Sequence, residues 1–411
     1  MFDAAIVCLV LTALLAYLNH RYVGLPATIG VMSIALVLSV ALVILDSLGA
    51  HAFRDYEISL LASIDFSDVL MRGMLSILLF AGALHIDLND LADFKWQVVF
   101  LSVGGTLAAT LLVGVVVWAL LPAAGFTLPL PFCLLFGALI SPTDPIAVMG
   151  IVKAAGAPKS IETVIAGESL FNDGVGIVLF SIFWAMATVG HSPGPIQTGM
   201  LILREAGGGI VFGLVLGYLT YRMLKSIDSY QVEVLITLAA VLGGYALAQH
   251  LHVSGPLAMV MVGLLIGNHG RRLAMSAQTR EHLDMFWELL DEILNAVLFV
   301  LLGLEVILIR FSPSVILAMV AVTATVLSIR LATVGAPVAL WHGFFRLPPG
   351  SWRVLTWGGL RGGISVALAL SLPAGPGRDV VLALTYGVVV FSILGQGLTI
   401  GRLVRKTFPG T

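Results

Sequence analysis

The segment "AGESLFNDGVGIVLF", residues 166–180, places charged and polar side chains inside a long apolar stretch of the chain. Glu168, Ser169, Asn172 and Asp173 all lie in it, and apolar residues continue on both sides. A carboxylate at bilayer depth costs at least ~2.5 kcal/mol on insertion scales. If the segment spans a membrane, its two carboxylates therefore indicate a functional site.

The composition is that of a membrane protein. Of the 411 residues, 59% are hydrophobic and 11% are charged, whereas soluble domains carry roughly 25% charged residues. The formal charge of −2 offers no basic surface for nucleic acid, and Cys8 and Cys133 have no metal-site spacing. We therefore predict an all-α polytopic membrane protein that is surrounded by lipid, has no cofactor and binds no nucleic acid.

Apolar stretches of about 20 residues mark bilayer crossings. The long stretch around residues 232–268 is divided at Ser254-Gly255-Pro256, because proline breaks a helix there. The sequence then predicts thirteen spans, at about 4–19, 26–45, 70–86, 97–121, 131–152, 161–187, 201–224, 232–251, 254–268, 285–309, 313–342, 352–373 and 380–404.

The loop charges give these spans an orientation. With an external N-terminus and a cytoplasmic C-terminus, most loop Lys and Arg residues fall inside, including Arg271, Arg272, Arg402, Arg405 and Lys406. The outside receives only Arg54, Arg72, Arg204, Arg310 and Arg378. This asymmetry follows the positive-inside rule, and it predicts a multi-pass protein of the cell (inner or plasma) membrane.

The fifth span contains a predicted helix break in "GALISPTDPIAVMG", residues 137–150. Pro142 and Pro145 cannot donate backbone hydrogen bonds, and Pro145 disfavours helical geometry at Asp144. The helix is therefore expected to open around Thr143-Asp144. Interrupted helices of this kind form the ion sites of secondary transporters, and their freed carbonyls are potential ligands for a hard cation.

The polar residues of the sixth span share one sector of the helix. Relative to Glu168, Asn172 lies about 40° away, Ser169 about 100° and Asp173 about 140°. All four side chains can face the opened fifth span together. Their oxygen atoms suit sodium, potassium or protons and lack the softer nitrogen or sulfur ligands that transition metals favour.

Two arginines inside predicted spans supply the opposite charge. Arg330 lies in the eleventh span and Arg361 in the twelfth, and buried charges are usually paired. The two guanidinium groups therefore face three carboxylates, those of Asp144, Glu168 and Asp173. One negative charge is left unmatched. A cation carrier needs such a charge.

The tenth span begins with a smaller acidic group. Glu288, Asp291 and Glu292 have i, i+3, i+4 spacing and share a face. They form either a cytoplasmic funnel that concentrates cations or a solvated helix end. Asn295, one turn further on, either lines the site or hydrogen-bonds between helices, and the second role is the one expected.

These motifs together resemble a known family. "SPTDPIAV", "GESLFNDGVGIVLF", a lone arginine in an apolar span and "GGLRGG" are similar to the monovalent cation:proton antiporters of the NhaP and sodium/proton exchanger branch. The resemblance implies that Asp173 carries the ion and proton, while Ser169 and the backbone of Thr143 coordinate the cation next to Asp144. It also implies that Glu168 pairs with Arg330 and that Asn172 stabilises the site.

The resemblance further implies a homodimer built from two inverted six-span repeats that a linking span joins. A core, at about residues 97–187 and 313–404, would move against a scaffold, at about 4–86 and 201–309, within one transporter domain of residues 1–411. Some members have an acidic ligand in the third span, where this chain has Ala81. A third side-chain carboxylate is therefore in doubt.

The predicted function is exchange of Na⁺ or Li⁺ for H⁺, without enzymatic chemistry. The empty site has a formal charge of −1, and one Na⁺ or one H⁺ neutralises it. This charge balance predicts electroneutral one-for-one exchange. Potassium/proton exchange by the same site is the nearest alternative, because selectivity depends on cavity size and ligand number. A cation channel and an intramembrane protease are weaker alternatives.

Overall fold

The computed structural model describes residues 2–47, 73–189, 194–309, 311–373 and 375–409, and these residues form helices and no strands. The α-helices are α1 (Phe2–Leu18), α2 (Ala27–Ser47), α5 (Leu75–Leu84), α6 (Leu88–Asp93), α7 (Lys95–Val99), α8 (Thr106–Leu120), α9 (Leu130–Ile140), α10 (Ile146–Ala154), α11 (Lys159–Val189), α12 (Pro195–Ile202), α13 (Gly208–Leu224), α14 (Tyr230–His250), α15 (Gly255–Leu265), α16 (Arg271–Leu273), α17 (Ala277–Leu304), α18 (Pro313–Arg330), α19 (Ala336–Leu340), α20 (His342–Phe345), α21 (Ser351–Trp357), α22 (Gly363–Leu370), α23 (Pro376–Phe391) and α24 (Leu398–Thr407).

Short turns of wider or tighter pitch extend several of these helices. The π-helical turns are η1 (Asn19–Val23), η3 (Phe100–Gly105), η5 (Leu203–Gly207), η6 (Ile266–Gly270), η8 (Leu331–Gly335) and η9 (Ser392–Gly397). The 3₁₀ turns are η4 (Leu121–Ala124) and η7 (Glu305–Leu308). Five of the π-helical turns, η3, η5, η6, η8 and η9, join neighbouring α-helices into longer rods, such as α18, η8 and α19.

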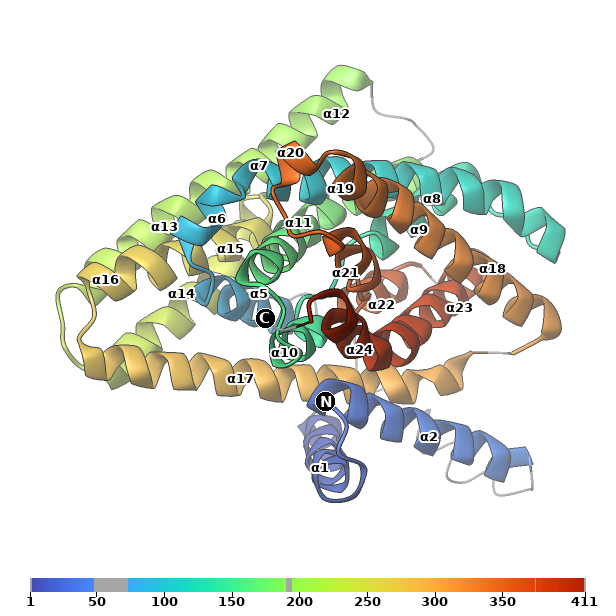
Figure 1. Cartoon of the computed structure of the whole chain (residues 1–411), viewed down its shortest axis with the longest axis horizontal. Helices are drawn as coiled ribbons and strands as arrows, with labels where there is room; N and C mark the ends of the chain where they lie inside the picture. Colours follow the sequence, from blue (N-terminus) through green and yellow to red (C-terminus); the bar gives the residue numbers. More distant parts are fainter. Residues whose placement is uncertain (1, 48–72, 190–193, 310, 374, 410–411) are drawn as a thin grey trace.

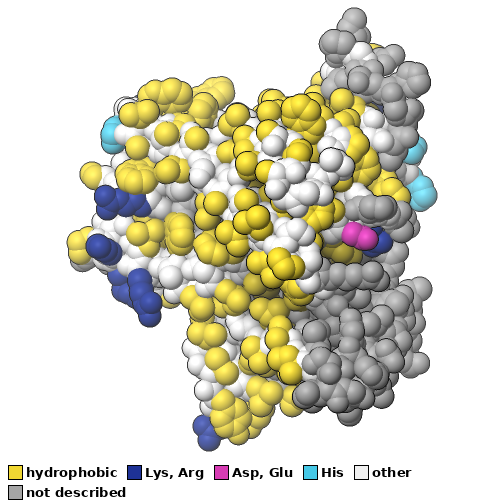
Figure 2. Space-filling model, turned by 90° about the vertical axis from the view of Figure 1, so that its right-hand side faces the viewer, with side chains coloured by type: hydrophobic (Ala, Val, Ile, Leu, Met, Phe, Trp, Pro, Cys, Tyr) yellow, Lys and Arg dark blue, Asp and Glu magenta, His cyan; other side chains and the backbone are white. Residues whose placement is uncertain are grey.

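Seven helical segments of the described chain are long and apolar enough to cross a membrane. They are Ile6–Val23, Lys95–Ala124, Lys159–Ala187, Gly199–Leu224, Tyr230–His250, Pro313–Leu340 and Gly377–Thr407. Figure 2 shows hydrophobic side chains spread over one face of the molecule, with Lys and Arg gathered towards its left edge. The chain is thus a multi-pass helical membrane protein, and its thirteen spans remain a prediction.

Each of the thirteen predicted ranges overlaps a described helix, but in the fifth and twelfth ranges non-helical residues separate two short helices. In the fifth range α9 ends at Ile140 and α10 begins at Ile146, and in the twelfth α21 ends at Trp357 and α22 begins at Gly363. The predicted break near Pro256 is present between α14 and α15. Arg54, Arg72 and Arg310 lie outside the described residues.

The long helix α17 crosses the lower part of the view in Figure 1 and packs against helices from several parts of the chain. Helices α1 and α2 pack on one side of it, and α5 and α14 pack on another. The interrupted pair α9–α10, helix α11 and the C-terminal helices α21–α24 lie together near the centre of the view. The site therefore forms where this central group meets α5 and α17.

Small residues let the central helices approach closely. An added Cβ at Gly137 of α9 would lie 2.2 Å from the Thr110 carbonyl oxygen of α8, and one at Gly114 would lie 2.8 Å from Leu134 Cα. Small residues at interfaces allow this contact between membrane helices, which gain little from the hydrophobic effect inside lipid. The start of the α9–α10 crossing is consequently fixed against α8.

Candidate functional site

Two helix interruptions meet at the centre of the molecule. Residues 141–145 separate α9 from α10, and residues 358–362 separate α21 from α22. The backbone N–H of Asp144 donates a hydrogen bond of 2.8 Å to the carbonyl of Leu360, so the two breaks are joined directly. Pro142 and Pro145 account for the first break. Glycines occupy four positions around the second.

Arg361 caps the carbonyl end of α9. Its Nη1 donates to the carbonyl oxygens of Ser141 at 2.6 Å and Pro142 at 2.9 Å. Its own backbone N–H donates to Ser392 Oγ at 2.8 Å, which fixes the second break. A guanidinium at this position also complements the negative end of the helix dipole. Arg361 therefore occupies the Ser141 carbonyl, which Pro145 leaves without a helical donor, and the Pro142 carbonyl beside it.

Thr143 is the centre of a hydrogen-bond cluster at the first break. Its hydroxyl lies 2.9 Å from Ser169 Oγ and accepts a hydrogen bond of 2.8 Å from Asn172 Nδ2. Asn172 Oδ1 in turn accepts from the backbone N–H of Thr143 at 3.3 Å. The amide of Asn172 thus gives the Thr143 N–H a partner where the helix is interrupted, and it ties the break to α11.

Glu168 and Arg330 form a buried ion pair. Arg330 Nη1 binds Glu168 Oε1, Nη2 lies 3.0 Å from Oε2, and Nη2 also donates to the Leu355 carbonyl. An added Cβ at Gly359 would lie 2.6 Å from Arg330 Nε. Glycine at this position therefore leaves room for the guanidinium group. The pairing expected from the sequence is present, and neither side chain lines the central cavity described next.

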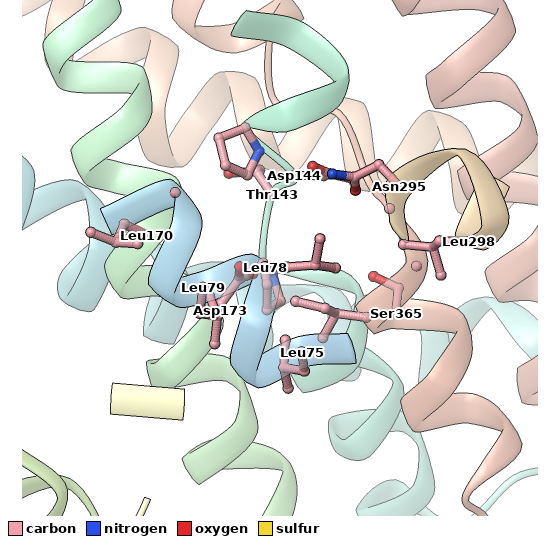
Figure 3. A pocket seen from close by; sticks show the side chains of 16 residues that line it. Leu75, Leu78, Leu79, Thr143, Asp144, Leu170, Asp173, Asn295, Leu298 and Ser365 are labelled. Carbon is pink, nitrogen blue, oxygen red and sulfur yellow. The ribbon is translucent and has the colours of Figure 1, made fainter. Parts of the chain in front are cut away.

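Asp173 faces a cavity of about 60 Å³ between the central helices and the pair α5 and α17. Its side chain is 4% exposed, and no described residue donates a hydrogen bond to its carboxylate or forms an ion pair with it. The polar residues that share the cavity wall are Thr143, Asp144, Asn295 and Ser365 (Figure 3). A carboxylate with polar neighbours and no protein partner suits a hard monovalent cation or a proton.

The rest of the cavity wall is apolar on the α5 side. Leu75, Leu78, Leu79 and Gly82 line it, while Ala81 is buried elsewhere. Helix α5 consequently presents no side-chain oxygen to the cavity. On the opposite side an added Cβ at Gly362 would lie 2.0 Å from Asp144 Oδ2, so that glycine leaves space for the Asp144 carboxylate.

The structure corrects one expectation and adds one residue. Asn295 does not hydrogen-bond between helices: its Nδ2 donates at 2.8 Å to the Asp291 carbonyl one turn back in α17, because the side chain lies along its own helix. Ser365 was not singled out from the sequence. Its position two residues after "GGLRGG" was the available signal, since the N-terminal turn of a broken helix faces the break.

The acidic group of α17 lies further along the same helix. Glu288 and Glu292 are exposed and Asp291 is half-buried, one turn before Asn295. None of the three lines the cavity. The geometry is therefore compatible with either a funnel or a solvated helix end.

Comparisons with known proteins identify the family. The model of the "Sodium/hydrogen exchanger, transmembrane" family matches residues 10–406. The chain is 52% identical to the Na⁺/H⁺ antiporter NhaP of Pseudomonas aeruginosa, over 100% of this chain and 98% of that protein. It is 36% identical to the Na⁺/H⁺ antiporter NhaH of Halobacillus dabanensis, over 83% of each.

A solved structure has the same fold. The sodium proton antiporter MjNhaP1 of Methanocaldococcus jannaschii superposes with a TM-score of 0.74 at 21% sequence identity, covering 98% of this chain and 97% of that chain. The family match over nearly the whole sequence agrees with the motifs around residues 141–180 and 358–363. This chain belongs to the sodium/hydrogen exchanger family of transmembrane antiporters.

Proposed function

We propose that this protein exchanges Na⁺ or Li⁺ for H⁺ across the membrane and that both ions compete for the Asp173 carboxylate. The observation that carries the proposal is that Asp173, although buried, faces a small cavity with a few polar side chains on its wall and has no partner among the described residues. The names of the relatives, which are Na⁺/H⁺ antiporters, support sodium as the cation. A site that binds one ion at a time couples the two fluxes.

The proposed ligands surround Asp173 on the α11 side and at the first break. The backbone of Thr143 and the Asp144 carboxylate supply oxygen atoms from the cavity wall. Ser169, whose hydroxyl contacts that of Thr143, does not line the cavity and would reach the ion after a local side-chain movement. Asn172 and the two arginines hold this arrangement without touching the ion. Sodium prefers such hard oxygen ligands.

One-for-one exchange follows from the local charges. The Glu168–Arg330 pair is neutral, and the positive charge of Arg361 offsets one of the two remaining carboxylates, Asp144 and Asp173. The empty site then has a net charge of −1, and one Na⁺ or one H⁺ neutralises it. A neutral loaded site crosses a low-dielectric region at lower cost than an empty charged one.

We also propose an elevator-type movement of a core against a scaffold. The core contains the two interrupted crossings, and the scaffold contains α5 and α17, so that the cavity lies on the boundary between them. Thirteen spans in two inverted repeats, a homodimer, and a cytoplasmic C-terminus complete the proposed architecture. The gathering of Lys and Arg at one edge in Figure 2 supports the orientation.

The test uses purified protein in vesicles with an imposed proton gradient and a fluorescent pH readout. Sodium, lithium or potassium is added in separate runs, with protein-free vesicles as the control. We expect sodium and lithium to dissipate the gradient. A response to potassium alone would replace the proposal with potassium/proton exchange, and a response to none of the cations would overturn antiport of these ions.

A further inference from the structure

Asn295 lines the central cavity and has an amide oxygen without a hydrogen-bond donor in the described chain. Its side chain is 1% exposed, and its Oδ1 has no hydrogen-bond donor among the described residues. The residue lines the same cavity as Asp173, from helix α17 (Figure 3). A buried amide oxygen without a partner costs free energy, and this makes Asn295 an exception that requires an explanation.

The orientation of the amide is fixed by its nitrogen. Asn295 Nδ2 donates to the Asp291 carbonyl at 2.8 Å. Exchanging the two ends of the amide would place Oδ1 against that carbonyl, and two acceptors would then repel each other. The hydrogen bond therefore keeps the oxygen directed away from the α17 backbone.

We propose that the Asn295 Oδ1 atom is a ligand of the transported cation and that α17 supplies it. This inference rests on the proposed function and specifies its ligand set. The cation would lie between Asp173 of α11 and Asn295 of α17, whereas α5, with Ala81, offers it no side-chain oxygen. A neutral amide adds a ligand without adding charge, so the one-for-one charge balance is preserved.

This arrangement has a consequence for ion release. The proton needs only the Asp173 carboxylate, whereas the cation also needs the α17 oxygen. Separation of α17 from α11 would therefore weaken cation binding more than proton binding. Loss of the Asn295 oxygen is expected to affect the cation dependence of exchange and to leave its proton dependence nearly unchanged.

The experiment compares Asn295→Leu, which is nearly isosteric and lacks the oxygen, with the unaltered protein in vesicles. We expect the KM for sodium to rise about tenfold or more, as loss of one polar partner of a charged group predicts, while the dependence on proton concentration stays the same. Sodium-dependent protection against thermal unfolding in detergent should weaken in parallel. Asn295→Ala, which also lacks the oxygen, gives the same comparison if the leucine variant does not fold.

Asn19 provides a matched control, because it is a buried asparagine whose Nδ2 and Oδ1 both bond to Leu25 and which lies away from the cavity. Asn19→Ala should lower thermal stability and leave the KM for sodium unchanged. An unchanged sodium KM in the Asn295 variants, with an active unaltered protein, would overturn the Asn295 assignment alone. An unaltered protein that does not respond to sodium or lithium would instead overturn the proposed function.

Discussion

The two interrupted crossings differ in how their breaks are made, and each break serves the other. Prolines open the crossing of α9 and α10, which leaves carbonyl groups that need donors. Glycines occupy the crossing of α21 and α22, where added Cβ atoms at Gly359 and Gly362 would meet Arg330 and Asp144. One crossing carries the proposed oxygen ligands, and the other supplies the Arg361 guanidinium and leaves space for Arg330 of α18 and for the Asp144 carboxylate. A helix break can thus either expose backbone groups or leave room for a neighbouring side chain.

The largest effect is expected from Asp173→Asn, which removes the carboxylate that is proposed to carry the ion. Exchange should fall to the level of protein-free vesicles, because an amide cannot take up a proton or balance a cation. The fold should persist, since a buried charge is replaced by a neutral group of similar size. Dissipation of the pH gradient by this variant on adding sodium would show that the ion is carried elsewhere.

The next effect concerns the buried ion pair of Glu168 and Arg330. Arg330→Ala leaves Glu168 buried without its partner, and breaking a buried pair in this way costs about 3 to 5 kcal/mol. The melting temperature should therefore drop further than in Asp173→Asn. Arg353→Ala, which removes an exposed arginine, is the control and should have little effect. Equal melting temperatures for the Arg330 and Asp173 variants would contradict a structural role for the pair.

A smaller effect is expected where the two crossings touch. Gly362→Ala would place a Cβ 2.0 Å from Asp144 Oδ2 and force that carboxylate to move. The KM for sodium should rise several-fold while the protein still folds. Gly150→Ala in α10, where an added Cβ has no neighbour within 4 Å, should leave exchange unchanged. Normal sodium dependence in both variants would mean that the position of Asp144 does not matter for binding.

The smallest expected effect is that of voltage, because the loaded site is neutral. The sodium/proton exchange rate should not change when potassium and valinomycin clamp the membrane potential at different values, once the vesicle assay has shown no exchange of potassium. Asn172→Asp adds a titratable charge next to Thr143 and should make the rate voltage-dependent. A systematic voltage dependence of the unaltered protein would rule out one-for-one exchange.

Local sequence rules were sufficient for the features that arise within one segment. Pro142 and Pro145 predicted the opening of the first crossing, and helical geometry placed Glu168 and Asn172 in one sector. Charge pairing predicted that buried carboxylates and arginines would offset one another, whereas the family resemblance implied the specific pair of Glu168 and Arg330. These inferences needed no knowledge of how the helices pack.

The features that depend on packing could not be predicted in the same way. Arg361 binds the carbonyls of Ser141 and Pro142, which are 220 and 219 residues away along the chain. The sequence identified Arg361 as a counter-charge for a carboxylate, whereas the structure shows it on backbone oxygens. The direction of the Asn295 oxygen depends on where α17 lies relative to α11, and spacing within α17 carries no information about that.

The backbone hydrogen bond from Asp144 to Leu360 restricts how this site can evolve. This bond fixes the break between α9 and α10 relative to the break between α21 and α22, which carries Arg361. A substitution that shifts one break therefore also disturbs the other. Adjustment to a larger or smaller cation is therefore expected to arise more readily in the opposite wall, at Leu75 and Leu78 of α5 or Asn295 of α17. Related antiporters that differ in ion preference should then differ in these wall residues before they differ at the joined breaks.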